Sequence, residues 1–174
     1  PASVIVVQHM PSNFTTYHAE RLDARSAMYV MEAEDGEPIR PGSILVAQGG
    51  RHLLLDEKGG QPVTMLLPRN EKQKTACPSI DFALTSIAPI FKKRLISVIL
   101  TGMGKDGEAG CDAVRKYGGR VIVQDRDTSM IYGMPGAVVS AGLVHEVLPV
   151  QEIADRIVHE VEEAIAGVIA SESQ

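Results

Sequence analysis

A glycine-rich segment with one carboxylate follows an apolar run in the second half of the chain. The run Ser97–Leu100 predicts a buried strand, and Gly102–Gly107 comes almost directly after it. Open α/β sheets build their sites where such strands end. Three interpretations fit these residues: a dinucleotide site, a loop that presents a catalytic carboxylate at Asp106, or a turn that only needs the freedom of glycine.

The dinucleotide interpretation is supported by spacing. Gly102, Gly104 and Gly107 match the pattern Gly-x-Gly-x-x-Gly, and a helix is expected after them. Asp125 lies about 20 residues further on, where it would bind a ribose hydroxyl. Two observations argue against this interpretation. Asp106 would place a carboxylate beside the diphosphate, and too few residues follow Asp125 for the usual second half of such a domain.

His9 brings a second chemical group to the same kind of position. It directly follows the predicted strand Ser3–Gln8, whose apolar residues on both faces are typical of a strand covered on both sides. Two parallel strands of one sheet end at the same edge, so we expect His9 to meet Asp106 there. An imidazole oriented by a carboxylate is the general-base half of a nucleophilic triad.

This pair lacks an evident nucleophile. No Gly-x-Ser-x-Gly turn occurs, and Ser12 and Ser79 are expected to cap helices. Cys77 is a weaker candidate, because it precedes a helix N-terminus, which favours a thiolate. The remaining histidines have no partner spacing and are expected to be structural or exposed: His18, His52, His145 and His159.

Composition limits the class of protein. The 174 residues are 44% hydrophobic and 22% charged, which suits one globular domain over residues 1–174. A net charge of −5 argues against nucleic-acid binding. Neither a membrane-spanning run nor a signal pattern is evident, so we expect a cytoplasmic protein. The two cysteines, Cys77 and Cys111, lack metal-type spacing and are too few for a disulfide scaffold.

The alternation of predicted strands and helices along the chain predicts an α/β fold: a doubly wound, mostly parallel sheet with an antiparallel hairpin flap in the middle third. The flap is expected between residues 28 and 67, where short apolar runs are separated by Gly49–Gly50 and Gly59–Gly60. In the first helix we expect Phe14, Tyr17 and Leu22 to share one face. Strands are expected at residues 3–8, 28–31, 43–47, 52–55, 63–67, 97–101, 120–124 and 143–147, and helices at 12–23, 78–90, 108–117, 133–141 and 150–169.

Several segments together resemble one known family. They are Val6–Pro11 with Phe14–Thr15, Ala19–Leu22, Glu32–Gly36, Pro41–Gly42, Pro78–Asp81, Val98–Gly107 followed by Ala109–Gly110, and Ile131–Pro135. In combination they resemble the catalytic domain of the chemotaxis protein-glutamate methylesterases (CheB), and the similarity runs from end to end of the chain. The resemblance favours the catalytic interpretation of the glycine loop.

The resemblance implies a function and a set of site residues. Members of the family hydrolyse glutamyl methyl esters, and deamidate glutamines, on the cytoplasmic helices of chemoreceptors. They use a Ser-His-Asp triad in that chain order, in which His9 matches the histidine and Asp106 the aspartate. Backbone N–H groups at Met103 and Gly104 match those that hold the oxyanion. No metal and no organic cofactor is implied.

The chain also departs from the family pattern. The family serine lies in a Gly-x-Ser-x-Gly-Gly turn after a strand that would precede residue 1, and neither this segment nor the family's receiver domain is in the sequence. Either an N-terminal segment is missing, which we favour, or the chain is a non-catalytic relative that binds receptors. We therefore expect the chain alone to be inactive. Two interpretations fit Met10, Met103 and Met134: they line a substrate groove, or they fill the core, which is the more common role of methionine.

Overall fold

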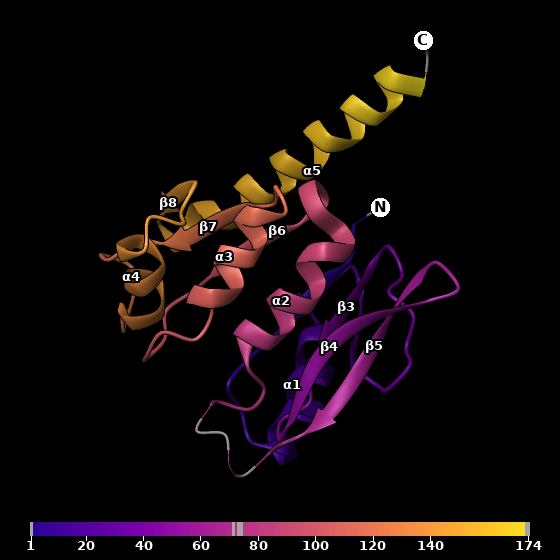
Figure 1. Cartoon of the computed structure of the whole chain (residues 1–174), viewed down its shortest axis with the longest axis vertical. Coiled ribbons are helices and arrows are strands. Elements are labelled where there is room, and N and C mark those ends of the chain that lie inside the picture. Colours follow the sequence, from indigo (N-terminus) through magenta and orange to yellow (C-terminus); the bar gives the residue numbers. More distant parts are fainter. Residues whose placement is uncertain (1, 71, 73–74, 173–174) are drawn as a thin grey trace. The chain divides into compact units, whose positions relative to one another are not determined.

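The computed structural model describes residues 2–70, 72 and 75–172, and the chain forms two compact units, residues 1–90 and 91–174 (Figure 1). The first unit contains β1 (Val4–Val6), α1 (Ser12–Asp23), β2 (Tyr29–Glu32), β3 (Ser43–Val46), β4 (Arg51–Lys58), β5 (Gln61–Pro68) and α2 (Ile80–Phe91), whose last residue lies at the boundary. The second contains the short helix η1 (Lys92–Arg94), β6 (Ile96–Ile99), α3 (Glu108–Lys116), β7 (Arg120–Gln124), α4 (Gly133–Ser140), β8 (Glu146–Leu148) and α5 (Val150–Glu172).

The sheet of the first unit has β3 at its centre, with β1 and β2 parallel to it on either side. Alternate residues of β3 are buried on opposite faces. Leu45 belongs to the same apolar cluster as Leu53 and Leu66 of the hairpin, whereas Val46 packs with Ala19 of α1. A strand buried on both faces needs a continuous apolar sequence, which Ser43–Val46 supplies after its first residue.

This pairing corrects the prediction for the middle third. The runs at residues 28–31 and 43–47 are predicted to form antiparallel hairpins, but both form parallel strands in one sheet with β1. Gly49 has another role than the predicted turn, since a Cβ there would lie 2.5 Å from the carbonyl oxygen of Met10 and from the Ser12 nitrogen. Glycine is needed at this position for a close backbone approach, not for a hairpin turn. β1 lies at the edge of this sheet in the described part of the chain, not at its centre.

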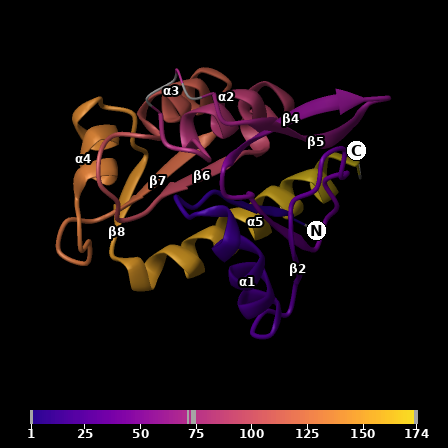
Figure 2. The ribbon, with the colours of Figure 1, turned by 90° about the horizontal axis from the view of Figure 1, so that it is seen from below.

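The predicted hairpin at Gly59–Gly60 is confirmed. β4 and β5 pair antiparallel over their whole length, from Arg51 opposite Pro68 to Lys58 opposite Gln61 (Figure 2). The two turn glycines have φ values of +60° and +81°, as a two-residue turn of the favoured twist requires. Helix α2 is joined to this hairpin by a hydrogen bond of 3.0 Å from the Leu55 N–H to the Ser86 hydroxyl.

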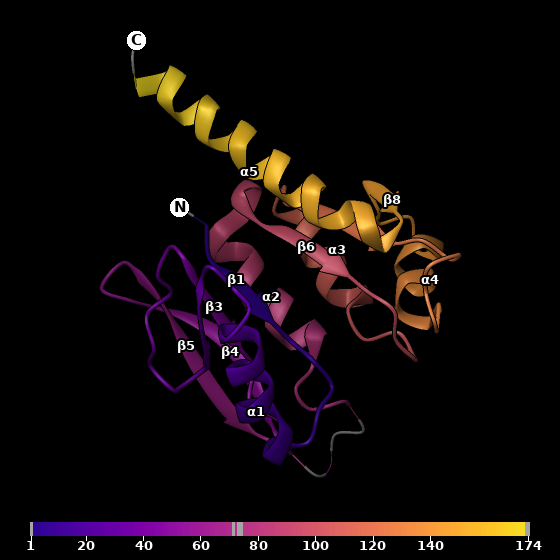
Figure 3. The ribbon, with the colours of Figure 1, turned by 180° about the vertical axis from the view of Figure 1, so that it is seen from behind.

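Helix α1 buries a different face from the one expected. Thr15 and Ala19 are its buried residues, whereas Phe14 is 52% exposed and Tyr17 is 59% exposed. Ser12 does not cap this helix, because the N-cap position is Pro11 and no side chain caps it locally. The small residues face the sheet because α1 lies close against β2 and β3 (Figures 2 and 3).

The second unit is built on a parallel sheet with the order β6-β7-β8. The central strand carries Val121, Ile122 and Val123, which are all fully buried. Helices α3 and α5 cover opposite faces of this sheet (Figures 1 and 3). The prediction of an edge strand near residue 145 is confirmed, since β8 pairs only with β7 in the described residues.

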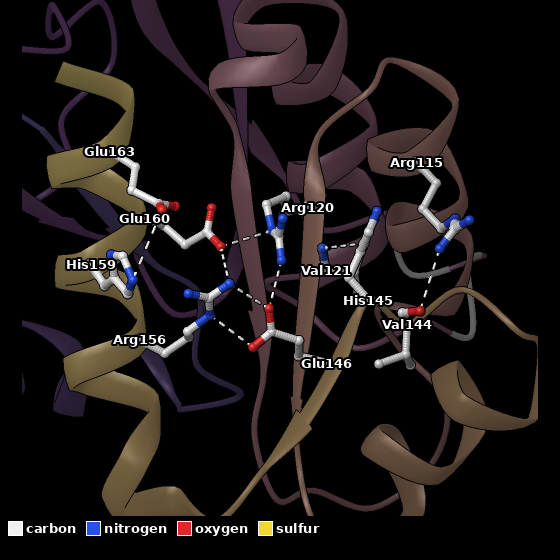
Figure 4. Close-up of polar contacts among 10 residues, drawn as sticks. All are labelled: Arg115, Arg120, Val121, Val144, His145, Glu146, Arg156, His159, Glu160 and Glu163. Atoms are coloured by element: carbon white, nitrogen blue, oxygen red, sulfur yellow. Dashed lines mark hydrogen bonds and ion pairs between the residues drawn. The ribbon is translucent and has the colours of Figure 1, made fainter. Parts of the chain in front are cut away.

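A network of four charged side chains joins β7, β8 and α5 (Figure 4). The Glu146 carboxylate accepts hydrogen bonds from Arg120 at 2.6 Å and from Arg156 at 2.7 and 2.8 Å. Glu160 completes the network with ion-pair contacts of 3.1 Å to Arg120 and 2.6 Å to Arg156. The hydrogen bonds from Arg156 lower the pKa of Glu146, although burial opposes them. Each charge therefore has an opposite partner, as half-buried ions require.

His145 beside this network makes folding stability depend on pH. Its Nδ1 accepts a 3.0 Å hydrogen bond from the Val121 N–H. Burial, with Arg115 and Arg120, lowers the pKa of His145, while Glu146 and Glu160 oppose the shift. The unfolded chain then binds more protons than the folded chain below about pH 6.5, the ordinary imidazole pKa.

We therefore expect the free energy of unfolding to be highest above this pH and to fall as pH drops through it toward the lower folded-state pKa. His145→Asn, which retains an acceptor, should flatten this slope in urea titrations between pH 5 and 8. Equal slopes for parent and His145→Asn would contradict the assignment.

The predicted fold class is confirmed as α/β, with parallel strands and one antiparallel hairpin. The parallel strands are distributed over two three-stranded sheets, one in each unit. No helix among the described residues has both the length and the apolar character that a bilayer crossing demands.

Candidate functional site

The buried side-chain amide of Gln124 fixes the start of the loop after β6 through a hydrogen bond. The Thr101 N–H donates to Oε1 of Gln124 at 2.8 Å, and Gln124 itself is only 2% exposed. The Gln124 Nε2 group donates in turn to the carbonyl oxygen of Thr128 at 2.8 Å. Both ends of the buried amide are thus satisfied, and the amide fixes the point at which β6 turns into the loop.

A second segment, Ile131–Met134, locks the glycine loop from the side. Gly102 donates its N–H to the Ile131 carbonyl at 2.9 Å and accepts from the Met134 N–H at 2.8 Å. The Ile131 N–H donates to the Thr101 hydroxyl at 2.9 Å. A Cβ on Gly133 would lie 2.8 Å from the Gly102 oxygen. The two backbones are therefore in direct contact, which only glycine permits.

Two further glycines shape the loop around Asp106. Gly104 and Gly107 have φ values of +89° and +105°, a region that side chains with Cβ atoms rarely adopt. Gly107 is the N-cap of α3, so the half-buried Asp106 immediately precedes the helix. Met103 projects outward with 78% of its surface exposed.

The Met103 N–H is available to a ligand. Within the described ranges, no protein acceptor takes a hydrogen bond from it. Backbone N–H groups on a fixed loop are the kind of donor that stabilises oxyanions in hydrolases. This agrees with the expected role of Met103 and Gly104, which remains a prediction.

The residues of the dinucleotide alternative have other uses. The Asp125 carboxylate accepts hydrogen bonds from the N–H and hydroxyl of Thr128 at 3.0 and 2.5 Å, so it closes its own turn. Gly102 makes room for the Met134 side chain, whose sulfur would clash with a Cβ there. Gly102 thus packs against protein, and this alternative gains no support from the structure.

His9 lies in the first unit, three residues beyond the end of β1 and three residues before α1 begins. Its side chain is exposed. Asp106, Met103 and Gly104 are brought together on one loop of the second unit. The pairing of His9 with Asp106 stays a prediction.

The thiol of Cys77 is not activated as a nucleophile. Burial raises the pKa of the Cys77 thiol above its ordinary value, and the charge of Arg69 opposes this only in part. A thiol with a raised pKa is a poor nucleophile at neutral pH. Ser79 caps α2 as predicted, since its hydroxyl accepts from the Phe82 N–H at 3.4 Å.

The structure decides between the two interpretations of the methionines only for Met134. Met134 is 6% exposed and packs in the core beneath Gly102, so it cannot line a surface. Met103 is exposed, and Met10 is half-buried. The histidines outside the predicted pair are structural or exposed as expected. For example, His52 is buried, and the centroid of its ring lies 4.7 Å from that of the Phe82 ring.

Sequence reasoning missed three residues that support the His9 segment: Thr15, Glu32 and Gly49. The Thr15 hydroxyl in α1 donates to the Glu32 carboxylate at the end of β2 and accepts from the Gly49 N–H in the turn after β3. Thr15 and Glu32 belong to segments that carry the family resemblance, and the pair Gly49–Gly50 predicts a hairpin turn instead. Residues 15, 32 and 49 are too far apart in the chain for spacing to reveal the contact.

Comparison with known proteins places these features in a family context. A model of the CheB methylesterase family matches residues 1–157. A protein-glutamate methylesterase/protein-glutamine glutaminase of Symbiobacterium thermophilum is 47% identical over 163 residues, covering 94% of this chain and 44% of that protein. A protein of the same name from Thermotoga maritima is 44% identical over 158 residues, covering 91% of this chain and 46% of that protein.

A solved structure is similar as well. The crystal structure of the Thermotoga maritima CheB methylesterase catalytic domain matches with a TM-score of 0.87 at 42% identity, over 91% of this chain and 84% of that one. The chain thus spans somewhat under half the length of these two curated relatives, 44% and 46%.

Proposed function

Because this chain belongs to the CheB methylesterase family, we propose that it supplies the general base and the oxyanion loop of a protein-glutamate methylesterase that also deamidates glutamines. The observation that carries the proposal is the fixed loop of residues 101–107. Within four residues it carries Asp106 and a Met103 N–H that donates to no acceptor among the described residues, inside a chain whose family match extends to His9. The acyl-accepting serine is proposed to come from outside residues 1–174.

His9 would act as the base in both halves of the reaction. In the first half it takes the proton of the serine hydroxyl as the oxygen attacks the γ-carbonyl carbon of the glutamyl ester. His9 then gives that proton to the leaving methoxide, and methanol departs. In the second half it deprotonates a water that attacks the acyl group, and it returns the proton to serine as the glutamate carboxylate leaves. With a glutamine substrate the leaving group is ammonia.

Asp106 and the loop would assist without exchanging protons. The carboxylate holds the imidazole in one tautomer and stabilises the imidazolium. The Met103 N–H, with Gly104 beside it, would donate to the oxyanion of each tetrahedral intermediate. One such donor typically lowers the barrier by about 3–4 kcal/mol.

The proposed substrates are the cytoplasmic helices of methyl-accepting chemoreceptors. The proposal places the protein in the cytoplasm, which is compatible with the lack of a membrane-crossing helix in the described part of the chain. A receiver domain is proposed as a further part of the complete gene product, which is supported by the greater length of the relatives.

The test is methanol release from chemoreceptors that carry tritiated methyl esters. We expect the complete gene product to release labelled methanol and to react with a fluorophosphonate serine probe. The 174-residue chain alone should do neither. Hydrolysis by the chain alone would show that one of its own residues is the nucleophile. Receptor binding without hydrolysis or labelling by the complete product would instead identify a non-catalytic relative.

A further inference from the structure

Thr15 is a polar residue buried completely at the start of α1, one turn after His9–Met10–Pro11. Its hydroxyl lies 2.5 Å from Oε1 of Glu32, 3.1 Å from the Gly49 nitrogen and 3.2 Å from the Ser12 carbonyl oxygen. These partners come from the end of β2, from the turn after β3 and from α1 itself. The buried hydroxyl therefore joins elements that lie far apart in the sequence.

The chemistry of the groups fixes the direction of each hydrogen bond. A hydroxyl has one proton to donate. The Gly49 N–H can only donate, so Thr15 accepts from it. The Glu32 carboxylate is charged and lies closer to the Thr15 hydroxyl than the Ser12 carbonyl oxygen does, so the hydroxyl donates its proton to Glu32. The 3.2 Å contact to the Ser12 oxygen is secondary. Two consecutive hydrogen bonds through the Thr15 hydroxyl therefore link the Glu32 carboxylate to the backbone N–H of Gly49.

Glu32 supplies what the first turn of α1 lacks. This helix has no side-chain cap and no acidic residue in its first turn. The two oxygens of Glu32 accept from the hydroxyls of Thr15 and Thr16, the latter at 2.8 Å. A carboxylate beside a helix N-terminus is stabilising because the aligned peptide dipoles are positive there. The end of β2 is thus tied to the beginning of α1.

Gly49 then clamps the segment that carries His9. An added Cβ would lie 2.5 Å from the Met10 oxygen, the Pro11 carbonyl carbon and the Ser12 nitrogen, which are all backbone atoms. The turn that contains Gly49 cannot move away from the Met10–Ser12 backbone without breaking the hydrogen bond from the Gly49 N–H to the Thr15 hydroxyl. The backbone just after His9 is therefore fixed in the space between Gly49 and α1.

We propose that Thr15 is a positioning residue for His9, acting with Glu32 through Gly49. The role in catalysis rests on the proposed function, in which His9 is the base. A base must lie within hydrogen-bond reach of the proton it takes, and a misplacement of about 1 Å can reduce a rate about 100-fold. The Thr15 hydroxyl would thus influence the reaction without touching the substrate.

Three variants separate positioning from general stability. Thr15→Val removes the hydroxyl at nearly constant volume, Thr15→Ser retains it, and Thr85→Val is the control on the exposed side of α2. The first readout is the imidazole 1H–15N spectrum of this chain, with the His9 signal identified by its loss in His9→Gln. We expect Thr15→Val to shift or broaden the His9 signal, and Thr15→Ser and Thr85→Val to leave it in place.

The second readout is kinetic and uses the complete gene product. We expect Thr15→Val to lower kcat by about 10- to 100-fold with little change in KM, and Thr15→Ser to restore most of the rate. A folded Thr15→Val protein with unchanged His9 signals and unchanged kcat would overturn the proposal. If His9→Gln remained fully active, the proposed function would fail instead, and the imidazole spectra would still decide whether Thr15 positions the ring.

Discussion

Alanine in place of His9 is expected to reduce methanol release by the complete gene product by at least about 1,000-fold, the scale on which triad members act in serine hydrolases. Without the imidazole, no group takes the proton from the attacking serine or returns one to the leaving methoxide. The residual rate would come from substrate binding and the oxyanion loop. Release of labelled methanol from chemoreceptors at saturating substrate measures the effect.

The control is His159→Ala in α5, whose side chain is 58% exposed and 3.9 Å from Glu163. It should retain the parent rate. Added imidazole should restore part of the His9→Ala activity, because the free base can occupy the vacated space, whereas it cannot repair a misfolded chain. A parent-like rate for His9→Ala would remove His9 from the mechanism.

Most elements of the fold could be predicted from local patterns. The strand at residues 120–124 and the helices that begin at residues 108 and 133 start where the sequence predicts, because a glycine lies at or directly before the first residue of each. Strand partners were harder to predict. The apolar run of β3 is compatible with a hairpin or a parallel pair, and only its contacts with β1 and β2 decide between them.

Glycine pairs illustrate this difference. Gly59–Gly60 form a hairpin turn with positive φ values, as their pattern predicts. Gly49–Gly50 look the same in sequence, yet Gly49 is required by the backbone of Met10–Ser12. A dipeptide pattern cannot report a contact with a segment so distant in the chain.

The candidate site shows the same division. The glycine loop at residues 102–107 could be predicted, because the glycines and Asp106 are adjacent in sequence. The way in which Ile131–Met134 holds this loop could not be predicted, because it depends on backbone hydrogen bonds that leave no residue signature. The relay through Thr15 was missed for the same reason, since a buried threonine in a helix resembles any other.

Gly133→Ala provides the sharpest test of how the glycine loop is held. Gly133 is the first residue of α4, where alanine is ordinarily preferred to glycine by about 1 kcal/mol. Here the new Cβ would lie 2.8 Å from the Gly102 oxygen and 2.9 Å from the Gly104 nitrogen. Because these are backbone atoms, the loop itself must move. We expect the free energy of unfolding to fall by about 1–3 kcal/mol in urea titrations.

The matched substitution is Gly167→Ala in α5, where an added Cβ has no atom within 4 Å. With no contact to oppose it, helix preference should raise stability by about 0.5–1 kcal/mol. The two variants make the same chemical change in a helix and are predicted to have opposite signs. In the complete gene product, Gly133→Ala should also lower kcat by about 10- to 100-fold, because Met103 and Asp106 move with the loop. If Gly133→Ala were as stable and as active as the parent, the loop would not depend on its contact with α4, and the proposed oxyanion site would lose its structural basis.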